Sequence, residues 1–186
     1  YPEIRHEIDA LLPQLAGIPR YHEVDPFQFR ISGRHDADRN WRVFMLYAMG
    51  ERPLANCARA PHTAALCARV PNLFQAFFSI LDPGKSVAAH CGPYRGYLRY
   101  HLGIKVPRES PPSIRIKDQR YQWREGESIL FDDSWEHEVY NQSSDIRVVL
   151  IVDILRPMPP LPHGINLVAQ MMIRQIYARG ILRLGS

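Results

Sequence analysis

The chain has 186 residues, of which 46% are hydrophobic and 23% are charged, and its formal net charge is +4. This composition is typical of a soluble globular protein with one domain and a real core, and it excludes a disordered chain. No Lys/Arg cluster interleaves with aromatic residues, so nucleic-acid binding is not expected. Three cysteines without paired spacing (Cys57, Cys67 and Cys91) argue against a disulfide framework and for a reducing compartment, and neither a signal peptide nor a membrane span is visible. We therefore expect a cytoplasmic protein, and because the chain opens at Tyr1 rather than methionine, we expect it to be a fragment.

The predicted elements begin with a helix and continue mostly as strands. Apolar residues recur at helical spacing from Ile4 to Leu15, and this helix is expected to end near Gly17. A buried strand is predicted over residues 40–50 and a short helix over 61–70. Strands separated by turn signals are predicted over residues 73–81, 86–90, 97–106, 113–118, 119–123, 127–132, 137–141 and 146–155. This pattern predicts a β-sandwich or jelly roll as one domain of residues 1–160, followed by a helical extension over 161–186.

Ionisable residues are concentrated in residues 131–153, between two apolar runs. We predict a hairpin that turns at about residues 142–144, which would place His137 opposite or diagonal to Arg147. A neutral imidazole that binds a metal, with a bound anion reaching the guanidinium, would explain this pairing. Taken alone, however, the stretch favours an ordinary hairpin with an exposed histidine and an arginine–carboxylate pair.

A second stretch, residues 84–107, changes that balance. His90 ends an apolar strand, and Arg99 and His101 fall on one face of the next strand, which would face either solvent or a wet cavity inside a barrel. Two histidines on different strands, each with an arginine nearby, suit a metal site better than a nucleophile. The sequence also has no nucleophile elbow, phosphate loop or dinucleotide fingerprint. Cys91 is expected to be a packed core thiol, while most of the carboxylates that could act as general bases should be solvated: Asp132, Asp133, Glu136 and Glu138.

Ordered blocks of sequence carry a resemblance to a known family. They are NW at 40–41, NC at 56–57, FSILDPGKSVAAHCGP at 78–93, LRYHLG at 98–103, the pattern W-x-x-G-E at 123–127, FDDSWEHEV at 131–139 and RVVLIVD at 147–153. With these blocks the chain resembles the aspartyl/asparaginyl β-hydroxylases, which are Fe(II)- and 2-oxoglutarate-dependent dioxygenases. The resemblance covers about residues 40–157, and it implies a mainly β double-stranded β-helix (jelly roll) with flanking N- and C-terminal helices.

The resemblance also implies roles for individual residues. His90 and His137 match the two histidines that hold the iron, and Gly92 stands where most related oxygenases have a carboxylate ligand. Arg147 matches the arginine that binds the distal carboxylate of 2-oxoglutarate, and Ser79 matches the serine that assists it. The other matches are Arg99 and His101, which would contact the other end of the cosubstrate or an acidic substrate, Asp133, a carboxylate near the water on the metal, and Trp41, an aromatic residue at the pocket wall.

The implied reaction couples the oxidative decarboxylation of 2-oxoglutarate by O2 to hydroxylation of a substrate C–H bond. The favoured substrate is the β-carbon of an aspartyl or asparaginyl residue, or a related acidic amino acid or peptide. Tyr97 departs from the animal enzymes, which have an arginine there, so an acidic substrate would lose one contact. The tail after Pro157 is similar to the bacterial branch that hydroxylates acyl chains of lipid A, so a lipid is the alternative substrate. A non-catalytic β-sandwich binding module is the competing class.

Gly92 allows two interpretations. A missing carboxylate could leave an open position on the metal, or the turn at Gly92-Pro93 could need glycine for a positive φ angle.

The tail combines an apolar stripe with basic residues. Ile165, Val168, Met172 and Ile176 recur at helical spacing, and the segment is too polar to span a membrane. We favour a helix over residues 165–184 that packs on the β-core or on a dimer partner. The alternative is a basic helix lying in the interface of an anionic membrane, which would make the protein peripheral to the inner membrane.

Overall fold

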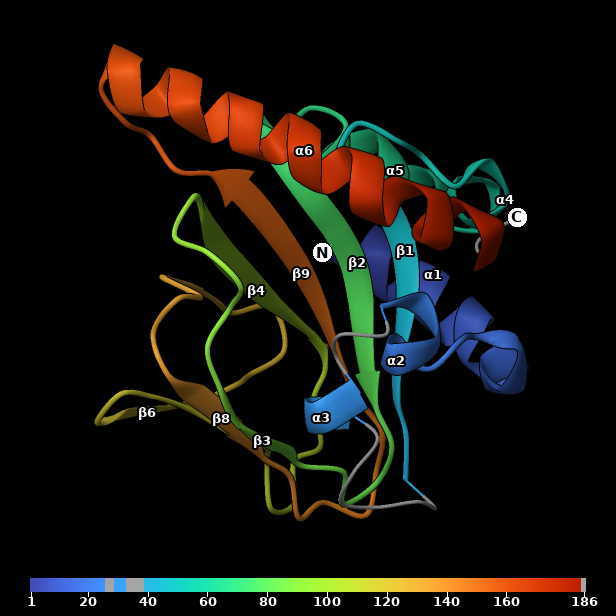
Figure 1. Ribbon diagram of the computed structural model, residues 1–186. Coiled ribbons are helices and arrows are strands. Elements are labelled where there is room, and N and C mark those ends of the chain that lie inside the picture. Colours follow the sequence, from blue (N-terminus) through green and yellow to red (C-terminus); the bar gives the residue numbers. More distant parts are fainter. Residues whose placement is uncertain (26–28, 33–38, 185–186) are drawn as a thin grey trace.

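The computed structural model describes residues 1–25, 29–32 and 39–184, and within helix α6 it describes the side chains up to residue 175 (Figure 1). Helices α1 (Pro2–Leu11), α2 (Tyr21–Val24) and α3 (Phe29–Ser32) precede the first strand, with a 3-10 helix (Leu12–Gly17) after α1. Helices α4 (Leu54–Arg59) and α5 (Pro61–Cys67) connect the first two strands, and α6 (Pro160–Leu184) follows the last. The strands are β1 (Trp41–Ala48), β2 (Leu73–Leu81), β3 (Val87–His90), β4 (Tyr97–Lys105), β5 (Ser113–Ile116), β6 (Gln119–Gln122), β7 (Ser128–Phe131), β8 (His137–Tyr140) and β9 (Arg147–Leu155).

The strands form two antiparallel sheets. The larger sheet has the order β1-β2-β9-β4-β7, and the smaller has the order β3-β8-β5-β6. Two facing antiparallel sheets with crossovers between them make the double-stranded β-helix that the sequence predicted, and helices flank it at both ends of the chain. The predicted fold class is confirmed.

Alternation along the strands of the larger sheet separates two hydrophobic clusters. In β2, Phe77 and Leu81 point into the space between the sheets, whereas Phe78 and Ile80 pack beneath the helices that cover the outer face. Both faces of β2 and β9 are therefore buried, which explains their nearly continuous apolar sequences. In β4, the same alternation turns Arg99 and His101 inward, so the cavity interpretation of that strand holds and the solvent interpretation does not.

The predicted hairpin between His137 and Arg147 is wrong. Strand β8 pairs with β3 and β5 in the smaller sheet, whereas β9 pairs with β2 and β4 in the larger one. The chain crosses from one sheet to the other between these strands. The side-chain amide of Asn141 donates to the carbonyl of Asp82, and the backbone N–H of Gly84 donates to Ser143, which hold the crossover against the β2–β3 connection.

Helix α6 begins earlier than predicted, at Pro160 rather than near residue 165. Prolines are tolerated in a first helical turn because the N–H groups there have no intrahelical partner, so the prolines preceding Ile165 belong to the helix. The helices α2, α3 and α4 were not predicted, since segments of four to six residues are too short to show helical periodicity.

The N-terminus of α5 depends on Glu7 of α1. Its carboxylate is buried and accepts hydrogen bonds from the backbone N–H groups of His62 and Thr63 and from the Thr63 hydroxyl. We expect Glu7→Ala to lower the free energy of unfolding by about 1–3 kcal/mol, because these buried donors would lose their acceptor. Urea denaturation followed by circular dichroism measures this change. Glu3→Ala on the same helix is the control and should leave stability unchanged, and equal effects of the two substitutions would contradict the capping role.

Candidate metal centre

His90 and His137 face each other across the β3–β8 pairing. They are register partners, and their ring centroids are 4.2 Å apart. Each Nδ1 lies 2.8 Å from a backbone carbonyl two residues earlier, that of Ala88 for His90 and that of Trp135 for His137. A hydrogen bond of this kind fixes the tautomer with the proton on Nδ1 and leaves the Nε2 lone pair available to a metal.

The surroundings keep both imidazoles neutral. Burial, followed by the neighbouring His137 ring, lowers the pKa of His90 to about 4. Burial also lowers the pKa of His137, although the Asp133 carboxylate acts in the opposite direction. Because a metal binds only the neutral imidazole, the folded chain presents both rings in the ligating form at neutral pH.

The carboxylate of Asp133 occupies the space beside Gly92. A Cβ atom built on Gly92 would overlap Oδ2 of Asp133, and the Gly92 N–H donates to the Asp133 carbonyl at 2.8 Å. Oδ1 of Asp133 lies 3.4 Å from Nε2 of His137. Gly92 is not among the residues with positive φ, so of the two interpretations of this glycine the one that needed a positive φ angle does not hold. Glycine is needed because it leaves room for the Asp133 carboxylate next to the two histidines.

Arg99 links Asp133 to a second buried carboxylate. Its Nη1 donates to Oδ1 of Asp133 at 2.6 Å, and its Nε and Nη2 donate to the two oxygens of Asp153 at 2.8 Å each. Tyr97 donates its hydroxyl to Oδ2 of Asp133 at 2.5 Å. Burial raises the pKa of Asp153 in spite of the guanidinium beside it. The charge of Arg99 is therefore already matched by two carboxylates of the chain itself.

Arg147, in contrast, is a buried cation that has no anionic partner in the part of the chain that the structure describes. Its Nη1 donates to the hydroxyl and the carbonyl of Ser79, at 3.1 and 3.3 Å, and its guanidinium lies over the Trp123 ring. Burial alone lowers its pKa to about 9, and its Nε has no hydrogen-bond partner among the described residues. Ser79 also accepts from Nε1 of Trp41 at 2.9 Å. A buried guanidinium that carries its charge at neutral pH is stabilised by an anion, so the surroundings of Arg147 would favour one.

His101 is a neighbour of Arg147, because both contact the Trp123 ring. Both of its ring nitrogens are buried and lack partners within the described part of the chain, as does Nε1 of Trp123, on which the ring stacks. Burial, together with the charges of Arg99 and Arg147, holds the pKa of His101 well below its ordinary value. A neutral imidazole with two unsatisfied nitrogens costs free energy unless a ligand or water binds it.

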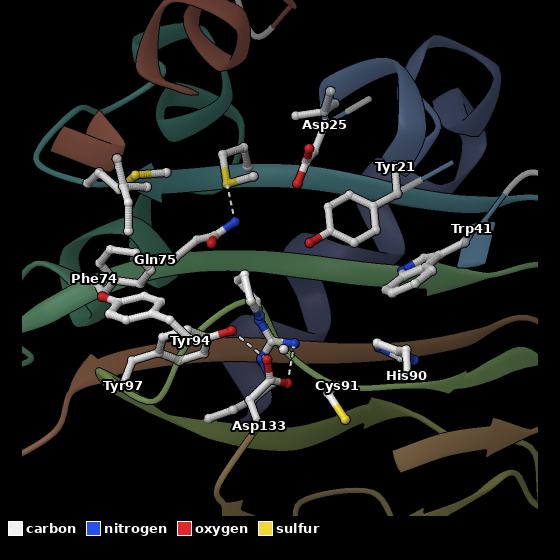
Figure 2. Close-up of a pocket in the computed structure, with 17 residues that line it drawn as sticks. Tyr21, Asp25, Trp41, Phe74, Gln75, His90, Cys91, Tyr94, Tyr97 and Asp133 are labelled. Carbon is white, nitrogen blue, oxygen red and sulfur yellow. Dashed lines mark hydrogen bonds and ion pairs between the residues drawn. The ribbon is translucent and has the colours of Figure 1, made fainter. Parts of the chain in front are cut away.

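An apolar pocket of about 290 Å³ extends from the histidine pair. Figure 2 shows Trp41 and His90 at one end of it, Phe74, Tyr94 and Tyr97 at the other, and Asp133 on its wall. Within the part of the chain that the structure describes, Arg99 is the one Lys or Arg that lines the pocket. The lining is otherwise mostly apolar and aromatic: Tyr21, Val24, Met45, Met49, Phe74, Tyr94 and Ile173. The pocket therefore suits an apolar group better than a charged one.

Six of the ten predicted site residues line this pocket: Trp41, His90, Gly92, Tyr97, Arg99 and Asp133. The other four do not line it but contact this group: Ser79 bonds Trp41, Arg147 bonds Ser79, His137 pairs with His90, and His101 reaches His137 through Phe131. Asp153 and Trp123 were missed as site residues. A single carboxylate inside the apolar run of β9 was the available signal for Asp153. The expectation of a packed Cys91 thiol is wrong, because this residue is exposed and lines the pocket.

The chain matches the sequence model of a known family over residues 1–157, and that family is described as aspartyl/asparaginyl beta-hydroxylase. The chain belongs to this family. It is 38% identical over 167 residues to an ornithine lipid ester-linked acyl 2-hydroxylase of Rhizobium tropici, covering 89% of this chain and 58% of that protein. It is 37% identical over 123 residues to the human aspartyl/asparaginyl beta-hydroxylase, covering 63% of this chain and 16% of that protein. The chain thus spans well under two thirds of the length of either relative.

The matches to solved structures are weak. A cupin 2 conserved barrel domain protein from Salinispora arenicola matches with a TM-score of 0.42 and 13% identity, over 72% of this chain and 88% of that one. A predicted oxalate decarboxylase from Thermotoga maritima matches with a TM-score of 0.40 and 15% identity, over 63% and 82% of the two chains. These scores are too low to carry an argument about the site.

The contact between Gly92 and Asp133 gives a prediction. Gly92→Ala should displace the Asp133 carboxylate and lower the melting temperature, because the added methyl group overlaps it. Asp133→Ala removes the obstacle, so the double variant should be more stable than the sum of the two single changes implies. Differential scanning calorimetry of the four proteins measures this coupling. Additive effects would show that the two positions do not compete for space.

Proposed function

We propose that the chain is an Fe(II)- and 2-oxoglutarate-dependent hydroxylase that acts on the acyl chain of a lipid. The observation that carries the proposal is a pair of neutral histidines at an apolar pocket, together with a buried arginine that has no carboxylate partner among the described residues and is linked to the pocket wall through Ser79 and Trp41. Membership of the hydroxylase family supports the reaction class. Iron(II), when bound, would supply with O2 and 2-oxoglutarate the oxidising power that C–H hydroxylation needs.

His90 and His137 would hold the iron through their Nε2 atoms. Their donor set fits ferrous iron, because imidazole is one of its usual ligands and the Nδ1 hydrogen bonds orient both rings. Among the described residues no group of three or more His, Cys, Asp or Glu side chains forms a metal site, which leaves a two-histidine arrangement with Asp133 beside it. Asp133 is oriented by Tyr97 and Arg99, so it can hold a proton donor or a water next to the metal.

Arg147 would bind the distal carboxylate of 2-oxoglutarate. A guanidinium binds a carboxylate through two parallel, charge-assisted hydrogen bonds, and burial strengthens them. Ser79 accepts from both Trp41 and Arg147, so its own hydroxyl proton remains to donate to the same carboxylate. His101, with two unsatisfied nitrogens on the same wall, would complete the cosubstrate site.

The substrate would enter from the apolar side. An acidic amino acid or peptide, which the sequence favoured, needs a free cation, and the arginine of the pocket is already held by Asp133 and Asp153. An acyl chain needs none and would contact Met45, Met49 and Phe74. The 38% identity to an ornithine lipid acyl hydroxylase supports the same choice.

The proposal is tested by reconstitution. Anaerobic addition of Fe(II) and 2-oxoglutarate to the protein should produce a weak visible absorption band. When air is then admitted, the protein should convert 2-oxoglutarate to succinate. His90→Ala and His137→Ala should abolish both signals, while His62→Ala, whose imidazole lies on the exposed surface of α5, should retain them. Normal turnover by either of the first two variants would rule out the metal assignment.

Mass spectrometry separates the substrate classes. An ester-linked acyl lipid should gain one oxygen atom and increase succinate release, whereas aspartyl and asparaginyl peptides should do neither. Hydroxylation of the peptide and not of the lipid would return the substrate to the acidic class. A binding module would be favoured by a different result: the iron-loaded wild-type protein binds 2-oxoglutarate but does not decarboxylate it, whichever of the two substrates is present.

Substitution of Arg147 tests the cosubstrate site separately. Loss of a charged partner in a buried site costs about 2–5 kcal/mol, so Arg147→Ala should raise the half-saturating 2-oxoglutarate concentration by about 30-fold or more. Arg147→Lys should recover only part of the loss, because an ammonium group lacks the planar fork. Arg69→Ala, at the exposed end of α5, is the control. An unchanged dependence on 2-oxoglutarate in the alanine variant would move the anchor elsewhere.

A further inference from the structure

Helix α6 presents its polar side to the protein. The residues that face the body recur at helical spacing and include His163, Asn166 and Gln170, with Ala169 and Ile173 between and beyond them. Asn166 is buried, and its amide donates to the carbonyl of Gly96 at 2.8 Å. Arg174 pairs with Glu51 near the start of α4. Apart from Ile173, which packs on the core, the contacts of this helix with the body are mostly polar or small.

The opposite side of α6 is apolar and exposed. Leu161, Ile165, Val168, Met171 and Met172 are between 58% and 77% exposed, and Leu167 is 40% exposed. The prediction that the stripe of Ile165, Val168 and Met172 packs on the β-core is wrong, and Ile176, its fourth member, lies outside the described side chains. We call these six exposed residues the α6 apolar face. Exposure of this apolar face to water is unfavourable, and burying it against another surface would lower the free energy.

The apolar face cannot be explained by a membrane span. No helix within the described residues has both the length and the apolar content that crossing a bilayer requires. Figure 1 shows α6 running across one end of the larger sheet. The exposed apolar side chains lie along the outer side of this one helix, so they project as a ridge. A flat apolar surface, into which a ridge can sink by part of its diameter, fits this shape.

The charge around the ridge selects the kind of surface. Residues 154–186 contain four arginines and no Asp, Glu or Lys. Arg156 pairs with Asp132 and Arg174 with Glu51, so Arg179 and Arg183 supply the remaining positive charge of this segment. Two copies of the chain that met through this segment would bring like charges together. An anionic lipid surface would instead be attracted, at about 1 kcal/mol for each basic residue near it.

We propose that the α6 apolar face docks on an anionic lipid bilayer, with the helix lying in the plane of the interface. Ile173 belongs to α6 and also lines the apolar pocket, so the docked helix would set the pocket next to the lipid surface. The inference extends the proposed hydroxylase activity but rests on the surface of the helix alone. It stands whether or not the acyl substrate is correct.

Vesicle sedimentation tests the docking. The chain of residues 1–186 is mixed, without iron or 2-oxoglutarate, with vesicles of phosphatidylcholine alone or of phosphatidylcholine with phosphatidylglycerol. It should sediment with the anionic vesicles, and less so at high salt. The variant Ile165→Gln/Val168→Gln/Met172→Gln should bind at least about tenfold more weakly, because its apolar anchors are lost while glutamine preserves the helix.

Exposed apolar residues elsewhere provide the matched control. Leu130→Gln/Tyr140→Gln alters side chains that are 58% and 40% exposed on β7 and β8, and it should bind vesicles as the unaltered chain does. Circular dichroism and melting temperature show that each variant is folded. Equal sedimentation of the α6 variant and the unaltered chain, or no sedimentation of the unaltered chain, overturns the proposal. A third result also overturns the proposal. In it, size-exclusion chromatography shows that the unaltered chain is a dimer and the α6 variant is not, while the two bind vesicles equally. Because the assay contains no iron or cosubstrate, a failure of the proposed hydroxylase activity cannot change its result.

Discussion

The bridge that Arg99 makes between Asp133 and Asp153 holds the cavity together. Asp153 lies on β9 and Arg99 on β4 of the larger sheet, while Asp133 precedes β8, the strand that carries His137 in the smaller sheet. The bridge therefore ties the loop beside the candidate metal centre to the opposite sheet. Two buried carboxylates so close together could not both ionise without the guanidinium between them, and removing one member of such a group commonly costs about 3–5 kcal/mol.

The candidate site has two chemically different parts. In one part, Arg147 has no carboxylate partner among the described residues, and buried nitrogen atoms of its neighbours His101 and Trp123 also lack partners there. In the other part, the lining is aromatic and aliphatic, and its arginine is already neutralised. A small dianion and an apolar chain would thus be sorted to these two parts by electrostatics and solvation alone.

The sequence predicted the parts of this structure that depend on local pattern. Alternation and turn residues located the nine strands, and the family resemblance named His90 and His137, which the structure places side by side. The sequence could not predict which strands pair, because the pairing of β8 with β3 joins residues far apart in the sequence, and a hairpin between β8 and β9 agreed equally well with the local pattern. The sequence also could not show why residue 92 is glycine. Only the folded chain shows that a carboxylate from another loop fills the space beside that residue.

The buried charge of Arg147 would also link the stability of the fold to a bound anion. An anion that binds the folded chain and not the unfolded one shifts the folding equilibrium by mass action, adding about 2.7 kcal/mol at a hundred times its dissociation constant. Among the described residues no carboxylate offsets the lost hydration of this guanidinium, so a bound anion would supply part of the free energy of folding. The lifetime of such a protein in a cell would rise and fall with the concentration of the anion that it binds. A shortage of that anion would lower the amount of folded protein.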